Sequence, residues 1–444
     1  MQFSMLIFTS DDKLSNARFM STVFLYFAGF KFKHYVYLRV MEIARLAVVF
    51  IVIILLLRLK LSVGMSIFLG GVALGFLFGQ HIFDIGKSVF RGMIAWRTIR
   101  LILIVSIISS LGAILKNLKV TNRLVSGIEN LSGSIKVTLV LCPVIIGLMP
   151  MPGGALLSAP LVAAGAEGQP IGRGRLAAIN FWFRHIFEFC WPIYPGIILA
   201  AAILELEITQ IALWQAAFSI PFIVGGLIFL IIPMKNVSKF TRDTSLKASW
   251  MNVLSGVWPI LAVVFITFTF GADLLLSLVI AFVLFLAVIR PSVGLTLRSI
   301  KEGCSFAIIS LMFGIMVFQA IISDSGAAVD IANRIALWGV PDWVVVSLSC
   351  FLIGFVAGIV TAYVGIVYPI LIPILINGGS PDIAMIVLAY ASGLVGVMIS
   401  PLHLCLILTK EYFKTSFRKM YPLILGPAAV VAVTVGVALA LGYG

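Results

Sequence analysis

The chain has 444 residues, of which 61% are apolar and only 11% are charged, and its net charge is +14. An ordinary soluble domain carries roughly 25% charged residues, and the mean hydropathy here is +1.17. This composition excludes a soluble globular enzyme and a disordered chain. It predicts an all-α polytopic membrane protein, because the apolar runs have the length of about 17–25 residues that spanning helices need.

The basic residues stand singly between apolar runs, which is the pattern of positively charged cytoplasmic loops and not of a nucleic-acid groove. We therefore expect membrane lipid around the protein and no nucleic-acid partner. The five cysteines all lie in apolar stretches without a CxxC motif, so we interpret them as small hydrophobic residues. With four histidines and no HExxH motif, we expect no metal and no other cofactor.

Residues 1–40 differ from the rest of the chain. They hold several charges around one apolar run, 19–30, which is too short to span a bilayer comfortably. The first sustained apolar helix opens at Met41. We predict that residues 1–40 are an N-terminal extension and that the functional chain begins near Met41.

Two prolines set the register of an internal repeat. Pro160 and Pro369 are 209 residues apart, and so are Pro192 and Pro401. The same offset aligns apolar runs along the whole length. We predict two repeats, 41–233 and 250–444, joined by a charged cytoplasmic linker over 234–249.

Each repeat contains six apolar segments in the same order. In the first they are 43–62, 64–80, 98–116, 135–165, 175–204 and 210–233, and in the second 252–270, 272–290, 304–322, 342–376, 383–409 and 421–442. The fourth segment is too long for one span and is interrupted by proline and glycine, which fits a re-entrant hairpin better than one long kinked span. Each repeat then has five transmembrane helices plus one hairpin. Since five crossings are odd, the second repeat must be inverted.

The distribution of charge agrees with this topology. Basic residues gather in the loops on the side of the linker, and acidic residues such as Glu205 and Asp324 gather on the other side. One loop disagrees, because four basic residues fall on the outer side: Lys87, Arg91, Arg97 and Arg100. The sequence offers no physical account of this loop.

Inverted repeats with broken helices are typical of secondary transporters, whose substrates bind where the helices break. Half-helix N-termini at such breaks attract anions. We predict helix breaks at Pro192 and Pro401. The predicted substrate-binding residues are Pro152, Gly153, Gly154, Ser158, Arg184, Thr361, Tyr363, Gly365, Ser392 and Ser400.

Ionisable residues within an apolar span are expensive and mark functional sites. Arg184 and Glu188 are four residues apart and would share one helix face, with His185 between them. We predict an anion-binding arginine beside a proton-carrying carboxylate, with His185 and His403 as candidate proton relays. A structural ion pair, an arginine at the membrane edge and a purely structural histidine are the alternatives.

Two stretches carry a family resemblance: GLMPMPGGALLSAPLVA from Gly147 to Ala163, and SGLVGVMISPLHLCLILTKEYF from Ser392 to Phe413. They resemble a prokaryotic integral-membrane family of unknown function in the ion-transporter superfamily, related to gluconate permeases and citrate and dicarboxylate carriers. The resemblance implies an inner-membrane protein with a scaffold domain and a transport domain that moves like an elevator. It also implies a homodimer. The Ser-Asn-Thr signatures of sodium-coupled carriers are missing at the two hairpin tips.

The sequence therefore predicts a secondary active transporter of a small organic anion, coupled to H⁺ in preference to Na⁺. A cation/proton antiporter that uses Glu188 is the alternative. A non-transporting scaffold or enzyme is disfavoured, because no nucleophile–base set and no metal set stands at a recognisable spacing, and no GxxxxGK loop is present.

Overall fold

The structure is a computed structural model, and it describes residues 44–118, 127–128, 134–150, 154–234, 246–337 and 339–443. The predicted N-terminal extension, Pro152 and Gly153 of the first hairpin, and most of the predicted linker lie outside the described residues. The helix that follows the linker begins at Leu246, so it includes the last four residues assigned to the linker.

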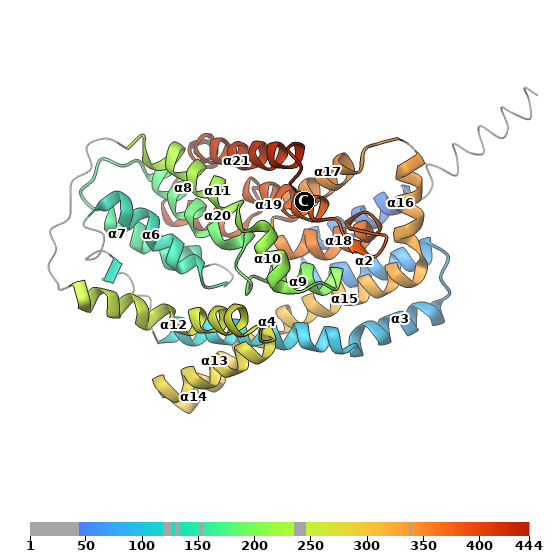
Figure 1. Cartoon of the computed structure of the whole chain (residues 1–444), viewed down its shortest axis with the longest axis horizontal. Coiled ribbons are helices and arrows are strands. Elements are labelled where there is room, and N and C mark those ends of the chain that lie inside the picture. The colour runs from blue at the N-terminus through green and yellow to red at the C-terminus, as the bar shows by residue number, and fades with distance from the viewer. Residues whose placement is uncertain are drawn as a thin grey trace, which may run out of the picture.

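The described chain is almost entirely helical (Figure 1). The first half contains a helix over 44–58, α2 (Val63–Leu77), α3 (Ile82–Ile94), α4 (Trp96–Asn117), α6 (Ile135–Gly147), α7 (Ala155–Gly165), α8 (Arg173–Arg184), the 3₁₀-helix η1 (Ile186–Phe189), α9 (Pro195–Leu204), α10 (Ile208–Ala216), α11 (Ser219–Gly226) and the π-helix η2 (Leu227–Ile231). The second half contains α12 (Leu246–Phe270), α13 (Leu274–Ile289), α14 (Val293–Gly303), α15 (Phe306–Ser325), α16 (Ala327–Leu337), α17 (Asp342–Ala357), α18 (Val360–Leu375), α19 (Ile383–Met398), α20 (Leu404–Tyr412) and α21 (Phe417–Ala440).

The helices form two groups. An outer bundle consists of α2, α3, α4 and α12 to α15, and a broken-helix bundle consists of α6 to α9 and α17 to α20. Within each bundle, helices from the first half of the chain pack against helices from the second half. In the broken-helix bundle α7 packs on α20 and α18 packs on α9, while in the outer bundle α3 packs on α15 and α14 packs on α4.

Four helical segments have the length and apolarity to cross a membrane, and a fifth is formed by α10 with α11 and η2, bent by 43°. The four are Trp96–Asn117, Ser249–Phe270, Val293–Ser325 and Phe417–Ala440. α12 and α13 expose large apolar side chains such as Phe265 and Val283, as helices that face lipid do. The chain is thus a multi-pass membrane protein. The sequence predicted ten spanning helices, whereas most of the other described apolar helices have 10–17 residues.

Among the helices that the sequence did not predict, α3 and α14 are amphipathic and lie immediately before α4 and α15. The basic residues of α3 and the start of α4 are those of the outer loop that opposed the charge rule. Each of them forms an ion pair with a carboxylate, so this side of the molecule gains little net positive charge from them. The pairs are Lys87–Asp84, Arg91–Asp324, Arg97–Glu205 and Arg100–Asp273.

A short antiparallel hairpin follows α18. β1 (Ile376–Asn377) pairs with β2 (Ser380–Pro381), with Ile376 opposite Pro381. Gly378 and Gly379 form the turn with φ of 57° and 84°. A two-residue turn of this kind needs positive φ at both positions, which glycine adopts without steric cost.

Candidate functional site

The first helix break begins at Arg184, the last residue of α8. The chain then tightens into η1, where the Glu188 amide donates to the His185 carbonyl at 3.1 Å. Pro192 lies in the turn between η1 and α9. The prediction that Arg184 and Glu188 share one helix face is therefore wrong. The 3₁₀ turn has about three residues per turn instead of 3.6, which rotates Glu188 away from the α-helical position.

Helix breaks leave backbone carbonyls without helical partners, and side chains satisfy several of them here. At the first break His185 Nδ1 bonds to the Phe181 carbonyl at 2.6 Å, and the Tyr390 hydroxyl donates to the Glu188 carbonyl at 2.9 Å. At the second break, between α19 and α20, His403 Nδ1 bonds to the Val397 carbonyl at 3.1 Å, and this carbonyl also accepts from the Ser400 amide. Both histidines thus stabilise the break next to which they lie.

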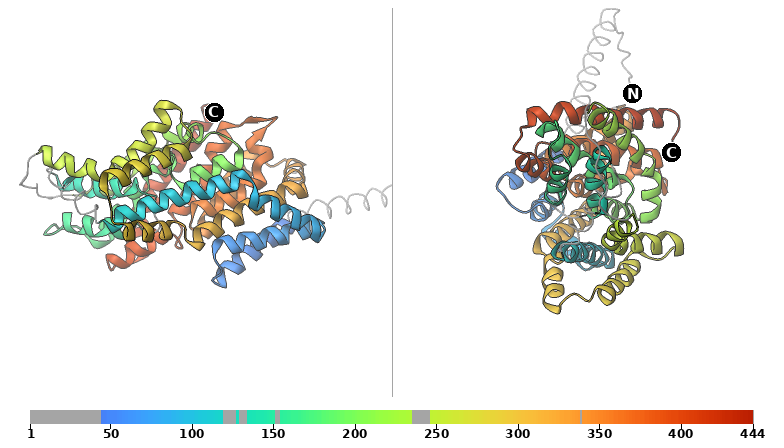
Figure 2. Two further views of the ribbon diagram at one scale, coloured as in Figure 1. Left: turned by 90° about the horizontal axis from the view of Figure 1, so that it is seen from below. Right: turned by 90° about the vertical axis from the view of Figure 1, so that its left-hand side faces the viewer.

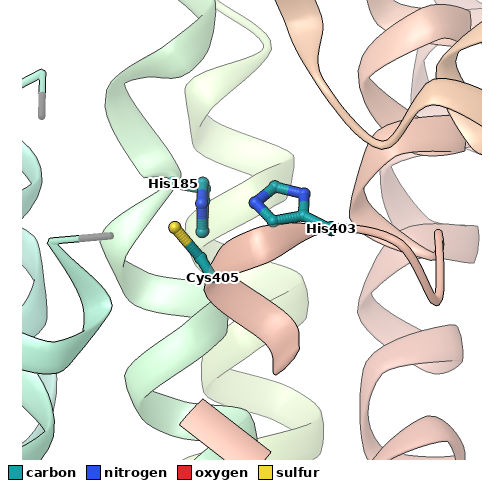
Figure 3. Close-up of side chains that lie close together, drawn as sticks. All are labelled: His185, His403 and Cys405. Carbon is teal, nitrogen blue, oxygen red and sulfur yellow. The ribbon is translucent and has the colours of Figure 1, made fainter. Parts of the chain in front are cut away.

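The two breaks meet at a cluster of His185, His403 and Cys405 (Figure 3). His185 follows α8, whereas His403 and Cys405 lie where α20 begins. The three residues expose 1, 6 and 7% of their surface, respectively. The two imidazole rings cross at 89° with their centroids 4.9 Å apart. Residues more than 200 positions apart in sequence therefore form one buried polar site.

Glu188 borders this cluster. Its Oε1 lies 3.8 Å from His185 Nε2, and its Oε2 has no hydrogen-bond partner among the described residues. Its backbone carbonyl accepts from Tyr390, whose own carbonyl accepts from the Tyr363 hydroxyl at 3.0 Å. This chain of hydrogen bonds connects the first break to α18 of the second hairpin.

The Arg184 side chain is 3% exposed and reaches the start of α7. A Cβ added at Gly154 would collide with its guanidinium, so the guanidinium lies directly against the backbone of Gly154. Its Nη1 is 3.9 Å from Cys405 Sγ. The missing side chain of Gly154 is thus what makes room for the arginine.

The predicted repeat pairs this contact with a different one in the second half. Under the predicted offset of 209 residues Arg184 corresponds to Gly393, and Gly154 corresponds to Tyr363. The ring of Tyr363 lies where a Cβ of Gly393 would be. One half therefore has a long cationic side chain over a glycine, and the other has a glycine under an aromatic ring.

Two cavities lie along α4, which crosses the face of the molecule seen from below in Figure 2. One of about 470 Å³ is lined by the C-terminal half of α4, by Pro150 and Gly154 of the first hairpin, and by residues around Glu302. The other, of about 270 Å³, lies at the N-terminal half of α4 against α9. Between the two cavities lies a space of only about 10 Å³, lined by Ile108, Leu111 and Ile193. These apolar side chains separate one cavity from the other.

The structure thus brings together five of the residues predicted from sequence: Gly154, Arg184, His185, Glu188 and His403. The other described candidates make contacts elsewhere. Ser158 donates to the Ala155 carbonyl of its own helix, Gly365 packs on Ile315, and Ser400 donates to the Phe355 carbonyl. Thr361 is buried in the first turn of α18, Ser392 is half-buried in α19, and Pro401 lies in the turn before α20.

Sequence reasoning missed two residues of this site. Cys405 was interpreted as a small hydrophobic residue, although it stands two positions after His403 and directly after a helix break. Tyr390 was not considered, because an aromatic residue inside an apolar helix carries no signal of its own. The contacts of His185 with Cys405 and of Glu188 with Tyr390 depend on packing between the halves, which spacing in the sequence does not reveal.

Comparison with known proteins adds a family. Among solved structures, the chain is similar to the YdaH transporter of Alcanivorax borkumensis, with a TM-score of 0.43 and 15% identity over 83% of this chain and 89% of that chain. No curated protein matches the chain. The model of the family described as protein of unknown function (DUF401) matches residues 42–442, and the chain therefore belongs to this family.

Proposed function

We propose that the protein is a secondary active transporter that moves a small organic anion across the cytoplasmic (inner) membrane. The observation that carries this proposal is the position of Arg184. Its buried guanidinium lies at a helix break, directly against Gly154, and Gly154 lines a cavity of about 470 Å³. A buried cation next to a cavity attracts a carboxylate or a sugar acid, because charge-assisted hydrogen bonds from a guanidinium to an anion are strong where water is excluded.

The proposal includes the predicted architecture. The two halves, 41–233 and 250–444, are inverted repeats, α6 with α7 and α17 with α18 are re-entrant hairpins, and the broken-helix bundle moves against the outer bundle in the manner of an elevator. Three observations support it: the exchanged helix contacts, the breaks at Pro192 and Pro401, and cavities at both ends of α4. Membership of the ion-transporter superfamily and a homodimeric state belong to the same proposal.

Of the predicted binding residues, Gly154 lines the cavity of about 470 Å³ and Arg184 contacts Gly154. We propose that these two residues bind the anion. Pro152 and Gly153 directly precede Gly154 in the sequence, and we propose the same role for them. Ser158, Thr361, Tyr363, Gly365, Ser392 and Ser400 are proposed to shape the two hairpins and breaks around the anion.

The coupling ion is proposed to be H⁺, carried by Glu188. Replacing Glu188 with glutamine keeps the size of the side chain and removes its ability to lose a proton. In proteoliposomes we expect the wild type to accumulate its anion under an imposed proton gradient and not under a sodium gradient. The Glu188→Gln variant is expected to lose proton-driven accumulation and to retain anion exchange between the two sides of the membrane.

The matched control is Glu167→Gln, which changes an exposed carboxylate just beyond α7 and should transport like the wild type. A panel of small carboxylates and sugar acids identifies the substrate. The proposal would be contradicted if the wild type transported no anion and instead exchanged cations, and if Glu188→Gln abolished this cation exchange. That result would establish the cation/proton antiporter, which is favoured by Oε2 of Glu188, an atom without a hydrogen-bond partner among the described residues.

A further inference from the structure

We propose that His185, His403 and Cys405 form a binding site for one thiophilic divalent cation, Zn²⁺ in particular. The three donor atoms lie within 4.8 Å of one another, and all three residues are buried (Figure 3). Imidazole nitrogen and cysteine sulfur are the ligands that zinc prefers, whereas Mg²⁺ and Ca²⁺ take oxygen ligands. The proposal concerns binding and holds whichever anion the protein moves.

The histidines are already oriented as metal ligands are. A carbonyl oxygen only accepts hydrogen bonds, so Nδ1 of each ring must carry the proton that it shares with the Phe181 or Val397 carbonyl. The lone pair is then on Nε2 of both rings. Histidines that bind metals are typically held this way, with the second ring nitrogen donating to a backbone carbonyl or a carboxylate.

The spacing fits with a small adjustment. Zinc bonds of about 2.0 Å to nitrogen and 2.3 Å to sulfur, arranged tetrahedrally, place neighbouring donor atoms about 3.3–3.7 Å apart. The present separations reach at most 4.8 Å, so each donor moves by about 1 Å or less to close around an ion. Rotation of the Cys405 side chain and of the two imidazole rings supplies a shift of this size.

Glu188 lies next to the three donor atoms but does not share their close spacing. Its Oε1 is 3.8 Å from His185 Nε2, and Oε2 has no described hydrogen-bond partner, so its carboxylate places negative charge beside the site. Arg184 lies 3.9 Å from the Cys405 sulfur and opposes a cation. It offsets only one of the two negative charges of a thiolate and a carboxylate, so the site keeps a net charge that attracts a divalent ion.

The site would join the two breaks directly. His185 and Glu188 belong to the first break, while His403 and Cys405 belong to the second. A bound ion would therefore bridge the two halves of the chain, with His185 on one side and His403 and Cys405 on the other. No other described group of three histidine, cysteine or acidic residues has this spacing.

The test uses the full chain, purified in detergent without a polyhistidine tag and stripped of metal with a chelator. Zn²⁺ binding is measured by competition with a chromophoric chelator, and Co²⁺ is added as a spectroscopic probe. We expect one tight Zn²⁺ per chain, and a Co²⁺ spectrum with the thiolate charge-transfer band and intense visible bands of a tetrahedral site. Cys405→Ser should lose that band and weaken Zn²⁺ binding at least tenfold.

Cys304→Ser is the matched control, because Cys304 is an exposed cysteine outside the cluster, and it should bind like the wild type. His403→Gln gives a second variant in case Cys405→Ser does not fold, and it should lower Zn²⁺ affinity while keeping a thiolate band. Binding that is equal in Cys405→Ser and the wild type, or no tight Zn²⁺ in the wild type, would overturn the proposal. Because no substrate is present, these results are independent of whether anion transport is observed.

Discussion

Replacement of Arg184 by glutamine is expected to raise the anion concentration for half-maximal uptake about 10- to 100-fold. Hydrogen bonds to a charged group contribute about 1.5–3 kcal/mol, and each 1.4 kcal/mol changes affinity tenfold. Glutamine keeps a polar side chain near Gly154 but removes the positive charge. The measurement is the concentration dependence of uptake into proteoliposomes. Arg184→Lys keeps the charge but loses the planar fork, so its loss should be smaller.

Arg173→Gln is the matched control, since Arg173 lies at the exposed start of the same helix, α8. Gly154→Ala tests the position of the guanidinium separately. The added Cβ would collide with the guanidinium and displace it while the charge remains, and uptake should weaken. Unchanged uptake in Arg184→Gln, with the protein folded, would show that Arg184 does not bind the anion.

Replacement of Gly314 by leucine is expected to prevent the folded protein from forming. α2 and α15 cross at this point with their backbones in contact: a Cβ at Gly314 would collide with the Gly64 carbonyl, and a Cβ at Gly64 would collide with the Ser310 carbonyl. Overpacking typically costs about 1–3 kcal/mol where side chains can yield. Backbone atoms of two helices cannot yield in that way, so the cost here should exceed this range.

The fraction of monodisperse protein in size-exclusion chromatography after mild heating is the measurement for Gly314→Leu. Gly436→Leu makes the same change in α21, where a Cβ meets nothing within 4 Å, and it should leave the profile unchanged. Gly64→Leu should behave like Gly314→Leu, since it affects the other side of one crossing. A normal profile for Gly314→Leu would mean that these helices do not cross closely.

The all-helical membrane class could be predicted from composition, because too few charges exist to cover a soluble surface. The order of the apolar helices could be predicted from the positions of proline and glycine, because these residues interrupt the apolar runs at similar intervals. α3 and α14 could not be predicted in this way. Their apolar residues occupy one face only, so neither forms the continuous apolar run that identifies a spanning helix.

Of the site, the sequence could predict residues that are unusual in an apolar span, such as Arg184 and Glu188. It could not predict how they are arranged, because the break begins at Arg184, eight positions before the proline that marks it. Nor could it predict the meeting of His185 with Cys405, which results from contact between α8 and α20. Such long-range contacts depend on packing of the whole bundle.

Helices of the first half pack on helices of the second half, and this arrangement has a consequence for biosynthesis. α9 ends at Leu204, and the helix that covers it, α18, begins at Val360. At about 5–20 residues per second the ribosome needs about 8–30 s to reach that helix. Throughout this interval the nascent first half stands in the lipid with its inner surfaces uncovered. The two halves therefore do not fold as autonomous units, and cotranslational assembly is completed only when the last helix, α21, which packs on α8 and α11, has been inserted.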